Sequence, residues 1–305
     1  SGGGSALAEK LLLPGATLED VRGLHQALVT CGAPIDPINT VRKHLSAVKG
    51  GRLAAAAPAA MKLTFAVSDV PAGRESALAS GPTIPDPGTR ADAERVILEY
   101  GLGAKIPPRI RDWLADNHMP ETPKAGDAAF ARSLFHLLLG LDDLFHPAHT
   151  AAAAAGFTPV CDNSSDDWPV RRAADHLLGE LARLQGQNPG RCVAVLADGE
   201  VSSPVTGNGI GGRNSAFVLA CVEKIAGKRI AVLSAGTDGI DGNSPAAGAV
   251  ADGDTLARAR ERGMDPEAFF RQSDAYGFFS RLGDDVTTGP TGNNLRDLRI
   301  LLAEP

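Results

Sequence analysis

The sequence predicts an α/β protein of two domains, built from mostly parallel sheets flanked by helices. Two observations support this prediction. Apolar segments with strand character alternate with segments whose apolar residues recur every three or four positions, an order typical of parallel sheets. Glycine accounts for 35 of 305 residues, and the glycines cluster where predicted strands give way to helices. Enzymes acting on small molecules use glycine at such junctions to bring the backbone close to a ligand.

The first half of the chain contains clear helix boundaries. Thr17 and Asp20 form an approximate capping box at the start of one helix, and Gly32 ends it. Thr89 begins a second helix that runs to about Tyr100. Apolar periodicity predicts further helices over 5–13 and 38–48 and a strand over 62–67.

The Pro- and Gly-rich stretch 119–126 is the best candidate for a domain boundary. We therefore expect one domain over 1–125 and a second over 126–305. In the second domain the predicted strands are 134–139, 157–161, 192–197, 201–206 and 229–234. The predicted helices there are 151–155, 170–184 and 214–225. Ligands of such sheets sit beyond the carboxyl ends of the strands, where the polar loops of this chain also lie.

Composition limits the classes of partner. Hydrophobic residues are 43% of the chain, enough for a sizeable core, and the net charge of -6 argues against nucleic acid and anionic membranes. The longest apolar runs, such as 133–141, are shorter than the roughly 20 residues of a membrane helix. Cys31, Cys161, Cys192 and Cys221 form no C-x-x-C pair. This spacing argues against a zinc ribbon or redox dithiol and favours the cytoplasm.

Two polar segments of the first half are candidate binding sites. Ser1, Gly2, Gly3, Gly4 and Ser5 stand directly before a predicted helix. Free N–H groups and the helix dipole suit an anion there, and a flexible linker is the equally weighted alternative.

Ser68 and Asp69 follow the strand predicted over 62–67. Asp69 is a candidate to hold magnesium or to cap the next turn, and without further context the cap is favoured.

A glycine-rich segment precedes the helix predicted over 214–225. Residues 207–212 satisfy the spacing G-x-G-x-x-G, which formally fits a dinucleotide-binding loop. The next strand, however, ends without an acidic residue for a ribose, and Arg213 stands at the start of the helix. Gly209, Gly211, Arg213 and Asn214 therefore suit a phosphate or carboxylate better. A glycine hairpin with a solvated arginine is the alternative.

A second loop carries oxygen ligands. Thr237, Asp238, Asp241 and Asn243 follow the strand predicted over 229–234, and two aspartates with an asparagine suit a hard cation. Two Asp-Gly turns are the alternative. A later loop with similar Thr-Gly character contains two further candidates, Thr291 and Asn293.

Other catalytic classes lack their signatures. The chain has neither a G-x-S-x-G elbow nor a G-x-x-x-x-G-K-[ST] loop, which argues against a serine hydrolase and a P-loop kinase. His146 and His149 form H-x-x-H with no evident third ligand, so solvated histidines are favoured over a metal site.

An ordered set of motifs resembles a known family. The set is S-G-G-G-S-A-L (1–7), I-N-T-V-R-K-H-L-S-A-V-K-G-G (38–51), S-D-V-P (68–71), A-S-G-P-T-I-P-D-P (79–87), D-G-E (198–200), G-x-G-x-G-G-R-N (207–214), S-A-G-T-D-G-I-D-G (234–242), A-A-G-A (246–249) and G-P-T-G-N-N (289–294). It resembles the type II glycerate kinases, whose C-terminal part is the MOFRL domain, expected here over about 190–300. The likeness runs through the entire chain.

The resemblance implies two α/β domains with an active site in the cleft between them. ATP would phosphorylate the 2-hydroxyl of D-glycerate, giving 2-phosphoglycerate, with Mg²⁺ as cofactor. The implied catalytic residues are Arg213, Asp238 and Asp241, and the two aspartates would hold the metal. The implied substrate- and nucleotide-binding residues are Ser1, Gly2, Gly3, Gly4, Ser5, Lys43, Lys49, Ser68, Asp69, Glu200, Gly209, Gly211, Asn214, Thr237, Asn243, Thr291 and Asn293. We expect a cytoplasmic monomer or homodimer that binds glycerate and nucleotide, with no nucleic acid and no membrane as partner.

The chain departs from the family pattern in three places. The family carries an N-terminal segment with a G-K-A-type lysine before the S-G-G-G-S loop, and this chain does not; we therefore expect residues 1–305 alone to be poorly soluble and inactive. Residues 72–75 lack the family's Gly-Asp, and Ser215 and Ala216 replace Gln-Glu. Two other functions stay open: an NAD(P)H-dependent hydroxypyruvate reductase, suggested by G-x-G-x-x-G, and a non-catalytic ligand-binding fragment.

Overall fold

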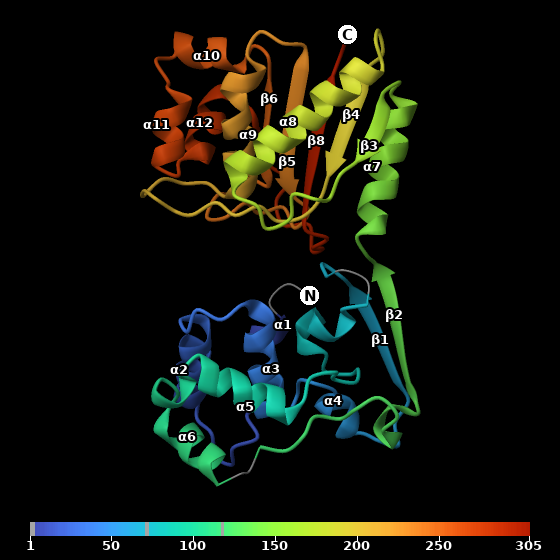
Figure 1. Ribbon diagram of the computed structural model, residues 1–305, viewed down its shortest axis with the longest axis vertical. Helices are drawn as coiled ribbons and strands as arrows, with labels where there is room; N and C mark the ends of the chain where they lie inside the picture. Colours follow the sequence, from blue (N-terminus) through green and yellow to red (C-terminus); the bar gives the residue numbers. More distant parts are fainter. Residues whose placement is uncertain (1–3, 71–72, 117–118) are drawn as a thin grey trace. The chain divides into compact units, whose positions relative to one another are not determined.

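The computed structural model describes residues 4–70, 73–116 and 119–305 (Figure 1). The chain divides into two compact units, Ser1–Leu138 and Leu139–Pro305. Each combines helices with a sheet, which confirms the predicted α/β class and the two-part organisation. No described helix has the length and apolar character needed to span a bilayer.

Unit 1 is mainly helical, and its sheet has two strands, β1 (Lys62–Val67) and β2 (Ser133–Leu139). Because β2 pairs with β1, the chain leaves unit 1 at 138–139, later than the boundary expected at 125–126. The helices are α1 (Gly4–Leu7), α2 (Leu18–Val29), α3 (Ile35–Leu45), α4 (Arg52–Ala55), α5 (Arg90–Glu99) and α6 (Pro108–Ala115), with 3₁₀ turns η1 (Glu75–Ser80), η2 (Leu102–Ala104) and η3 (Ala128–Phe130).

The capping signals of unit 1 work as predicted. The Thr17 amide donates to Asp20 Oδ2 over 2.8 Å, and the Asp20 amide donates to Thr17 Oγ1 over 3.2 Å, which completes the capping box of α2. Thr89 and Asp92 form the same box on α5. The apolar sides of α2, α3, α5 and α6 then meet in one core that includes Leu28.

The helix predicted over 5–13 is shorter in the structure, because α1 ends at Leu7. The following residues run towards α3, where Leu11 forms an isolated bridge with Ser46. The Glu9 carboxylate accepts hydrogen bonds from Lys49 Nζ and Ser46 Oγ, both at 2.6 Å. These pairings with the end of α3 replace the contacts that a continued helix would make.

Glu9 is unusually acidic for a buried carboxyl group. Burial opposes its ionisation, but the neighbouring His25 imidazole, the hydrogen bonds from Lys49 and Ser46 and the charge of Lys49 outweigh burial and hold the pKa of Glu9 at about 2. Its ordinary value is 4.5. The contacts of Glu9 with Lys49 and Ser46 therefore hold the segment after α1 against the end of α3 at any pH at which Glu9 is ionised.

Unit 2 is built on a six-stranded sheet of order β3-β4-β8-β5-β6-β7 (Figure 1). Its strands are β3 (Thr158–Cys161), β4 (Val193–Ala197), β5 (Ile230–Gly236), β6 (Gly248–Asp252), β7 (Asp285–Val286) and β8 (Asp297–Ala303). Its helices are α7 (Asp142–Ala154), α8 (Val170–Gln187), α9 (Arg213–Ile225), α10 (Thr255–Glu261), α11 (Pro266–Arg271) and α12 (Ala275–Leu282). Helices α8 and α9 lie over one face, and their apolar residues share a core with the strands.

The sheet of unit 2 is mixed, which corrects the prediction of mostly parallel strands. β3, β4 and β5 run in the same direction, as their alternation with helices predicts, and β3–β4 is a parallel pair. β8, which the sequence pattern did not predict, enters between β4 and β5 and is antiparallel to both. β6 and β7 extend the sheet with antiparallel pairs.

The strand predicted over 201–206 is a loop, with one isolated bridge between Ser202 and Pro169. The Ser202 amide donates to the Trp168 carbonyl, and the Val170 amide donates to the Ser202 carbonyl. Thr206 binds Ser273 instead of a neighbouring strand. The loop is therefore fixed by helix-side contacts and leads directly into α9.

We expect Glu9→Gln to remove an acid-sensitive part of the stability of unit 1. A carboxyl group with a lowered folded pKa stabilises above its ordinary pKa, and that stability is lost as pH falls from about 4.5 towards 2. The chain has two tryptophans, so a Trp168→Phe background leaves Trp113 to report on unit 1 in thermal melts at pH 7 and pH 3.5.

The exposed Glu99→Gln is the matched control and should keep the wild-type difference between the two pH values. An equal loss of melting temperature on acidification in Glu9→Gln and wild type would contradict this role of Glu9.

Candidate functional site

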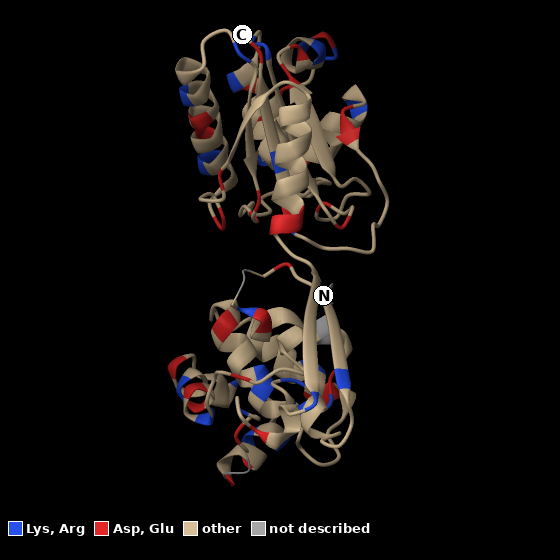
Figure 2. Ribbon diagram, turned by 90° about the vertical axis from the view of Figure 1, so that its right-hand side faces the viewer, with Lys and Arg blue, Asp and Glu red and all other residues tan. Residues whose placement is uncertain are grey.

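The candidate site lies in unit 2, at the sheet edge where β4 and β5 end and β8 begins. The register pairs Gly236 of β5 with Asp297 of β8, so the loops after β4 and β5 emerge beside the start of β8. Figure 2 shows acidic residues at this end of the unit. A pocket of about 650 Å³ opens there. Seven predicted residues line it: Gly209, Gly211, Arg213, Asn214, Asp238, Asp241 and Asn243.

Arg213 is the first residue of α9 and the central cation of the site. Its Nε and Nη2 donate to the two carboxylate oxygens of Asp297 over 2.6 and 3.3 Å. Its Nη1 donates to Glu200 Oε2 over 2.7 Å. Asp297 is 3% exposed, whereas Glu200 is 39% exposed, so Asp297 is the fixed support and Glu200 the solvent-facing one.

The Arg213 guanidinium stays charged and partly accessible. Burial lowers its pKa, but the hydrogen bonds and charges of Asp297 and Glu200 outweigh burial and raise the pKa above its ordinary value. A guanidinium has five N–H donors. Among the described residues, three of these donors meet carboxylates, and the side chain is 35% exposed. Arg213 is therefore oriented by its two carboxylate partners and still able to meet a further anion.

Asp241 lies beneath the start of α9 and closes its amino end. Its Oδ1 accepts from the Asn214 amide over 2.9 Å, and its Oδ2 accepts from the Ser215 amide and hydroxyl over 2.8 and 2.6 Å. Burial raises its pKa, although the hydrogen bonds from Ser215 and Asn214 oppose the rise. Ser215, which departs from the family pattern, thus contributes to the cap. The side chain expected to hold a metal is engaged with the helix.

Several amides of the glycine-rich loop are bonded within unit 2 and are not free for a ligand. The Gly209 amide donates to the Gln272 carbonyl over 2.9 Å, and the Ile210 amide donates to Asp274 Oδ1 over 3.0 Å. The Gly211 amide donates to Asn243 Oδ1 over 2.8 Å. These glycines allow close packing, because a Cβ at Gly209 would lie 2.4 Å from Asp274 Cβ. The loop is therefore bound to its own unit, unlike the phosphate cradle that its spacing predicts.

Two further loops meet beside the pocket. Asp238 Oδ1 accepts from the Ile240 amide over 3.0 Å, and the Asp238 carbonyl accepts from the Thr291 amide over 3.0 Å. Thr291 Oγ1 donates to the Thr237 carbonyl over 2.6 Å. The Asn293 amide donates back to Thr291 Oγ1 over 3.3 Å. The predicted threonines thus join the loops that carry Asp238 and Asn293.

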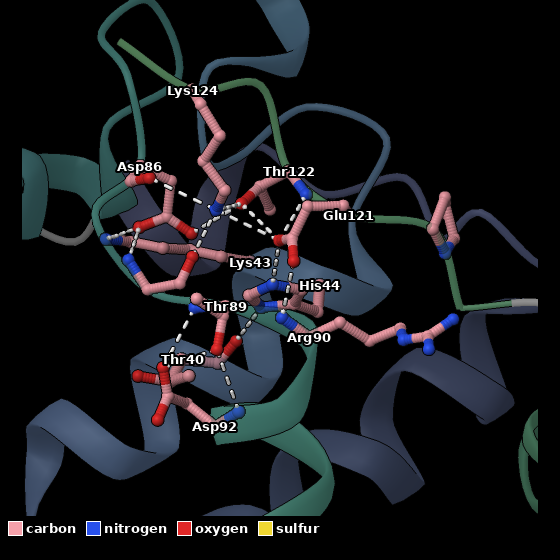
Figure 3. A network of polar contacts seen from close by, with 12 residues as sticks. Thr40, Lys43, His44, Asp86, Thr89, Arg90, Asp92, Glu121, Thr122 and Lys124 are labelled. Atoms are coloured by element: carbon pink, nitrogen blue, oxygen red, sulfur yellow. Dashed lines mark hydrogen bonds and ion pairs between the residues drawn. The ribbon is translucent and has the colours of Figure 1, made fainter.

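The predicted residues of unit 1 are occupied by contacts within that unit. Lys43 Nζ lies 3.0 Å from Asp86 Oδ1 in a buried ion pair, and Thr122 Oγ1 donates to Asp86 Oδ2 over 3.0 Å (Figure 3). Lys49 is 1% exposed, and its Nζ binds Glu9 and the Ala8 carbonyl. Both lysines are therefore buried, and the ammonium group of each is paired with a carboxylate of unit 1.

The other described positions predicted in unit 1 lie on the turn after β1 and at the start of α1. Ser68 Oγ donates to the Val70 carbonyl and accepts from the Val70 amide, on the turn that also carries Asp69. Ser5 Oγ lies 2.7 Å from Ser80 Oγ, one residue after Gly4 at the start of α1. Ser1, Gly2 and Gly3 fall outside the described residues.

Sequence reasoning missed two charged residues of the site, Asp297 and Arg299. Both lie on β8, where Asp297, Arg299, Leu301 and Ala303 are all buried and alternate with less buried neighbours. The segment reads D-L-R-I-L-L-A, and its period-two pattern with charged residues at inward positions was the available signal.

Comparisons with known proteins agree on one family. Residues 193–297 match the MOFRL family, and residues 1–115 match a domain of unknown function, DUF4147. A D-glycerate 2-kinase from Thermotoga maritima is 35% identical over 98% of this chain and 70% of its own. The chain belongs to the glycerate kinase family. A glycerate kinase crystal structure from the same organism superposes with a TM-score of 0.86, at 35% identity, over 99% of this chain and 71% of that one.

Names within the glycerate kinase family differ. A relative from Agrobacterium vitis is 40% identical over 99% of this chain and 68% of its own, and carries the provisional name hydroxypyruvate reductase. The MOFRL match ends at Asp297, so it includes Arg213 and reaches the first residue of β8. The site described above therefore lies within the MOFRL part of this family member.

We expect Asp241→Asn to destabilise unit 2. The amide nitrogen of asparagine would face the N–H and O–H donors of Ser215, and unmet buried donors cost about 1–3 kcal/mol. Urea unfolding in a Trp113→Phe background, followed by Trp168 fluorescence, measures the change in the free energy of unfolding.

Asp238→Asn serves as the comparison, because within the described part of the chain the Asp238 side chain accepts a single hydrogen bond, from the Ile240 amide. It should change the free energy of unfolding by less than about 0.5 kcal/mol. An Asp241→Asn protein as stable as wild type would show that the α9 cap contributes little.

Proposed function

We propose that this chain catalyses the ATP-dependent phosphorylation of D-glycerate on its 2-hydroxyl, giving 2-phosphoglycerate. Family membership supports the reaction class, and the oriented Arg213 is the observation that carries the proposal to the site. Phosphoryl transfer depends mainly on positioning and on neutralising charge, and a fixed guanidinium at a polar pocket supplies both. The charge that develops on the transferring group, or the glycerate carboxylate, would meet the remaining N–H donors of Arg213.

Fixed side chains distinguish this pocket from a P-loop. The amides of Gly209, Ile210 and Gly211 have protein partners, and Asp241 closes α9. Neutralisation of a phosphate would therefore fall to side chains, chiefly Arg213. Asp238 and Asn243 line the same pocket and would orient the substrate hydroxyl groups by hydrogen bonding.

Magnesium would enter together with the ATP phosphates. No group of three His, Cys, Asp or Glu side chains suited to a metal occurs among the described residues. Mg²⁺ commonly takes one or two carboxylates together with substrate phosphates and water. Of the two predicted ligands, Asp238 has one carboxylate oxygen, Oδ2, that accepts no hydrogen bond from the described residues. Both carboxylate oxygens of Asp241, in contrast, accept hydrogen bonds from α9. Asp238 is therefore the carboxylate that suits a nucleotide-borne ion.

The proposed function predicts ADP formation from ATP that depends on D-glycerate and on Mg²⁺. The intact gene product is incubated with ATP and D-glycerate, and ADP and phosphoglycerate are separated by chromatography, so that no NADH-coupled enzyme interferes. Incubation with hydroxypyruvate and NADH is the parallel arm. NADH oxidation in that arm, with no ADP from glycerate, would replace the kinase with a reductase.

Arg213→Lys should lower turnover by a factor on the order of 10²–10³, as for the loss of one fixed electrostatic contact. Lysine keeps the charge but cannot bind Asp297 with two donors and Glu200 with a third. The measurement is kcat for ADP formation, with Arg191→Lys, an exposed arginine of the same unit, as the matched control. Equal kcat values in Arg213→Lys and wild type would remove Arg213 from the mechanism.

A further inference from the structure

Arg299 occupies an unexpected position in the interior of unit 2. It lies on β8 between β4 and β5, opposite Ala197 and Ser234, and its side chain is 0% exposed. The alternation of β8 places it on the same face as Leu301 and Ala303, which belong to the hydrophobic core. An apolar residue at this position would continue the apolar face of β8, so the presence of a buried guanidinium requires a separate explanation.

The Arg299 guanidinium bonds to the turn that carries Glu200. Its Nη1 donates to the Asp198 carbonyl over 3.0 Å, and its Nη2 donates to the Gly199 carbonyl over 2.9 Å. These are the two residues immediately before Glu200. The buried arginine therefore fixes the backbone from which one support of Arg213 extends.

The same guanidinium also adjoins the second support. Arg299 Nη2 lies 3.7 Å from Asp297 Oδ2, the oxygen that accepts the 2.6 Å hydrogen bond from Arg213 Nε. The ring of Phe217 lies 5.3 Å from its Cζ on another side. Arg299 is thus the residue that contacts the backbone before Glu200 and the carboxylate of Asp297 at once.

Stability alone does not explain this arrangement. A buried charge loses its hydration, and apolar residues of similar volume often replace buried ion pairs without loss of stability. Arg299 Nε has no hydrogen-bond partner in the described part of the chain, and burial lowers the pKa of the guanidinium. Its hydrogen bonds go to the turn before Glu200 and its ion-pair neighbour is Asp297, so its polar contacts involve the two supports of Arg213.

We propose that Arg299 is a positioning residue for phosphoryl transfer: it fixes Glu200 and Asp297 and, through them, the orientation of Arg213. The inference rests on the proposed function for its catalytic consequence. Arg299 is buried and does not line the pocket that contains Arg213, so it would act through the guanidinium of Arg213 and not on substrate.

The test compares Arg299→Met and Arg299→Lys with wild type in the intact gene product, using ATP and D-glycerate. Methionine fills the volume without charge, and we expect kcat to fall about 10- to 100-fold, because a displacement near 1 Å in a catalytic group can cost 10² in rate. The KM for ATP should change less than about threefold, since the fold of the pocket is kept. The lysine of Arg299→Lys can still donate to one of the two carbonyls, so the kcat of this variant should lie between those of wild type and Arg299→Met.

A double-mutant cycle tests the route of action. In an Arg213→Lys background, where the bidentate fork is already lost, Arg299→Met should lower kcat by less than about twofold further. A full additional loss in that background would show that Arg299 acts independently of Arg213 and would overturn the inference.

Leu301→Val is the matched structural control, because Leu301 lies on the same face of β8, two residues further into the core. It should lower the urea midpoint, measured by Trp168 fluorescence, while kcat stays within about twofold of wild type. If Leu301→Val reduced kcat as much as Arg299→Met, the effect of Arg299 would be general core damage and the proposal would fail.

A spectroscopic readout separates this inference from the proposed function. The Arg213 Nε–H signal in ¹⁵N NMR, assigned by its loss in Arg213→Lys, reports the hydrogen bond to Asp297 without any turnover. We expect this signal to shift and exchange faster in Arg299→Met and to be kept in Leu301→Val. A wild type that makes no ADP from glycerate would refute the proposed function alone. An unchanged Nε–H signal in both Arg299 variants would refute the positioning role, whether or not the enzyme is active.

Discussion

The buried carboxylate of Asp297 is the group on which the site depends. It accepts two hydrogen bonds from Arg213 and has Arg299 as its second cationic neighbour, while only 3% of its side chain is exposed. A carboxylate at such a depth is stabilised by both neighbouring guanidiniums, and it balances part of their charge in return. These contacts fix Arg213 at the pocket without a ligand, so a phosphate that binds there as we propose would require little reorganisation.

The start of α9 explains why side chains dominate this site. Many anion sites use free amides at a helix amino end, but Asp241 already accepts from the Asn214 and Ser215 amides. Three amides of the glycine-rich loop before the helix, those of residues 209–211, are donated to other loops of unit 2. These backbone amides therefore stabilise the fold of unit 2, and the positive charge available to a ligand comes from Arg213.

The sequence was informative wherever a local rule was sufficient. Capping boxes gave the starts of α2 and α5, and strand–helix alternation gave the common direction of β3, β4 and β5. The family resemblance placed Arg213, Asp238 and Asp241 in one site, and they line one pocket, but the resemblance could not show that Asp241 faces the helix. Spacing also could not place β8, because its partners β4 and β5 are fixed by pairing across long stretches of chain. The burial of Lys43 and Lys49 likewise depends on Asp86 and Glu9, which lie far from them in sequence.

The central place of β8 has a consequence for the order in which unit 2 can be assembled. This strand comes after all the others in the sequence, yet it supplies the inner partner of both β4 and β5. During synthesis β3, α8 and β4 can associate early, whereas β4 and β5 must wait for pairing partners that emerge much later, and such non-local closure is slow. Until then two strand edges rich in apolar residues stay open to other chains. A ribosome stall or truncation before residue 297 would therefore yield an aggregation-prone product, not a weakened enzyme.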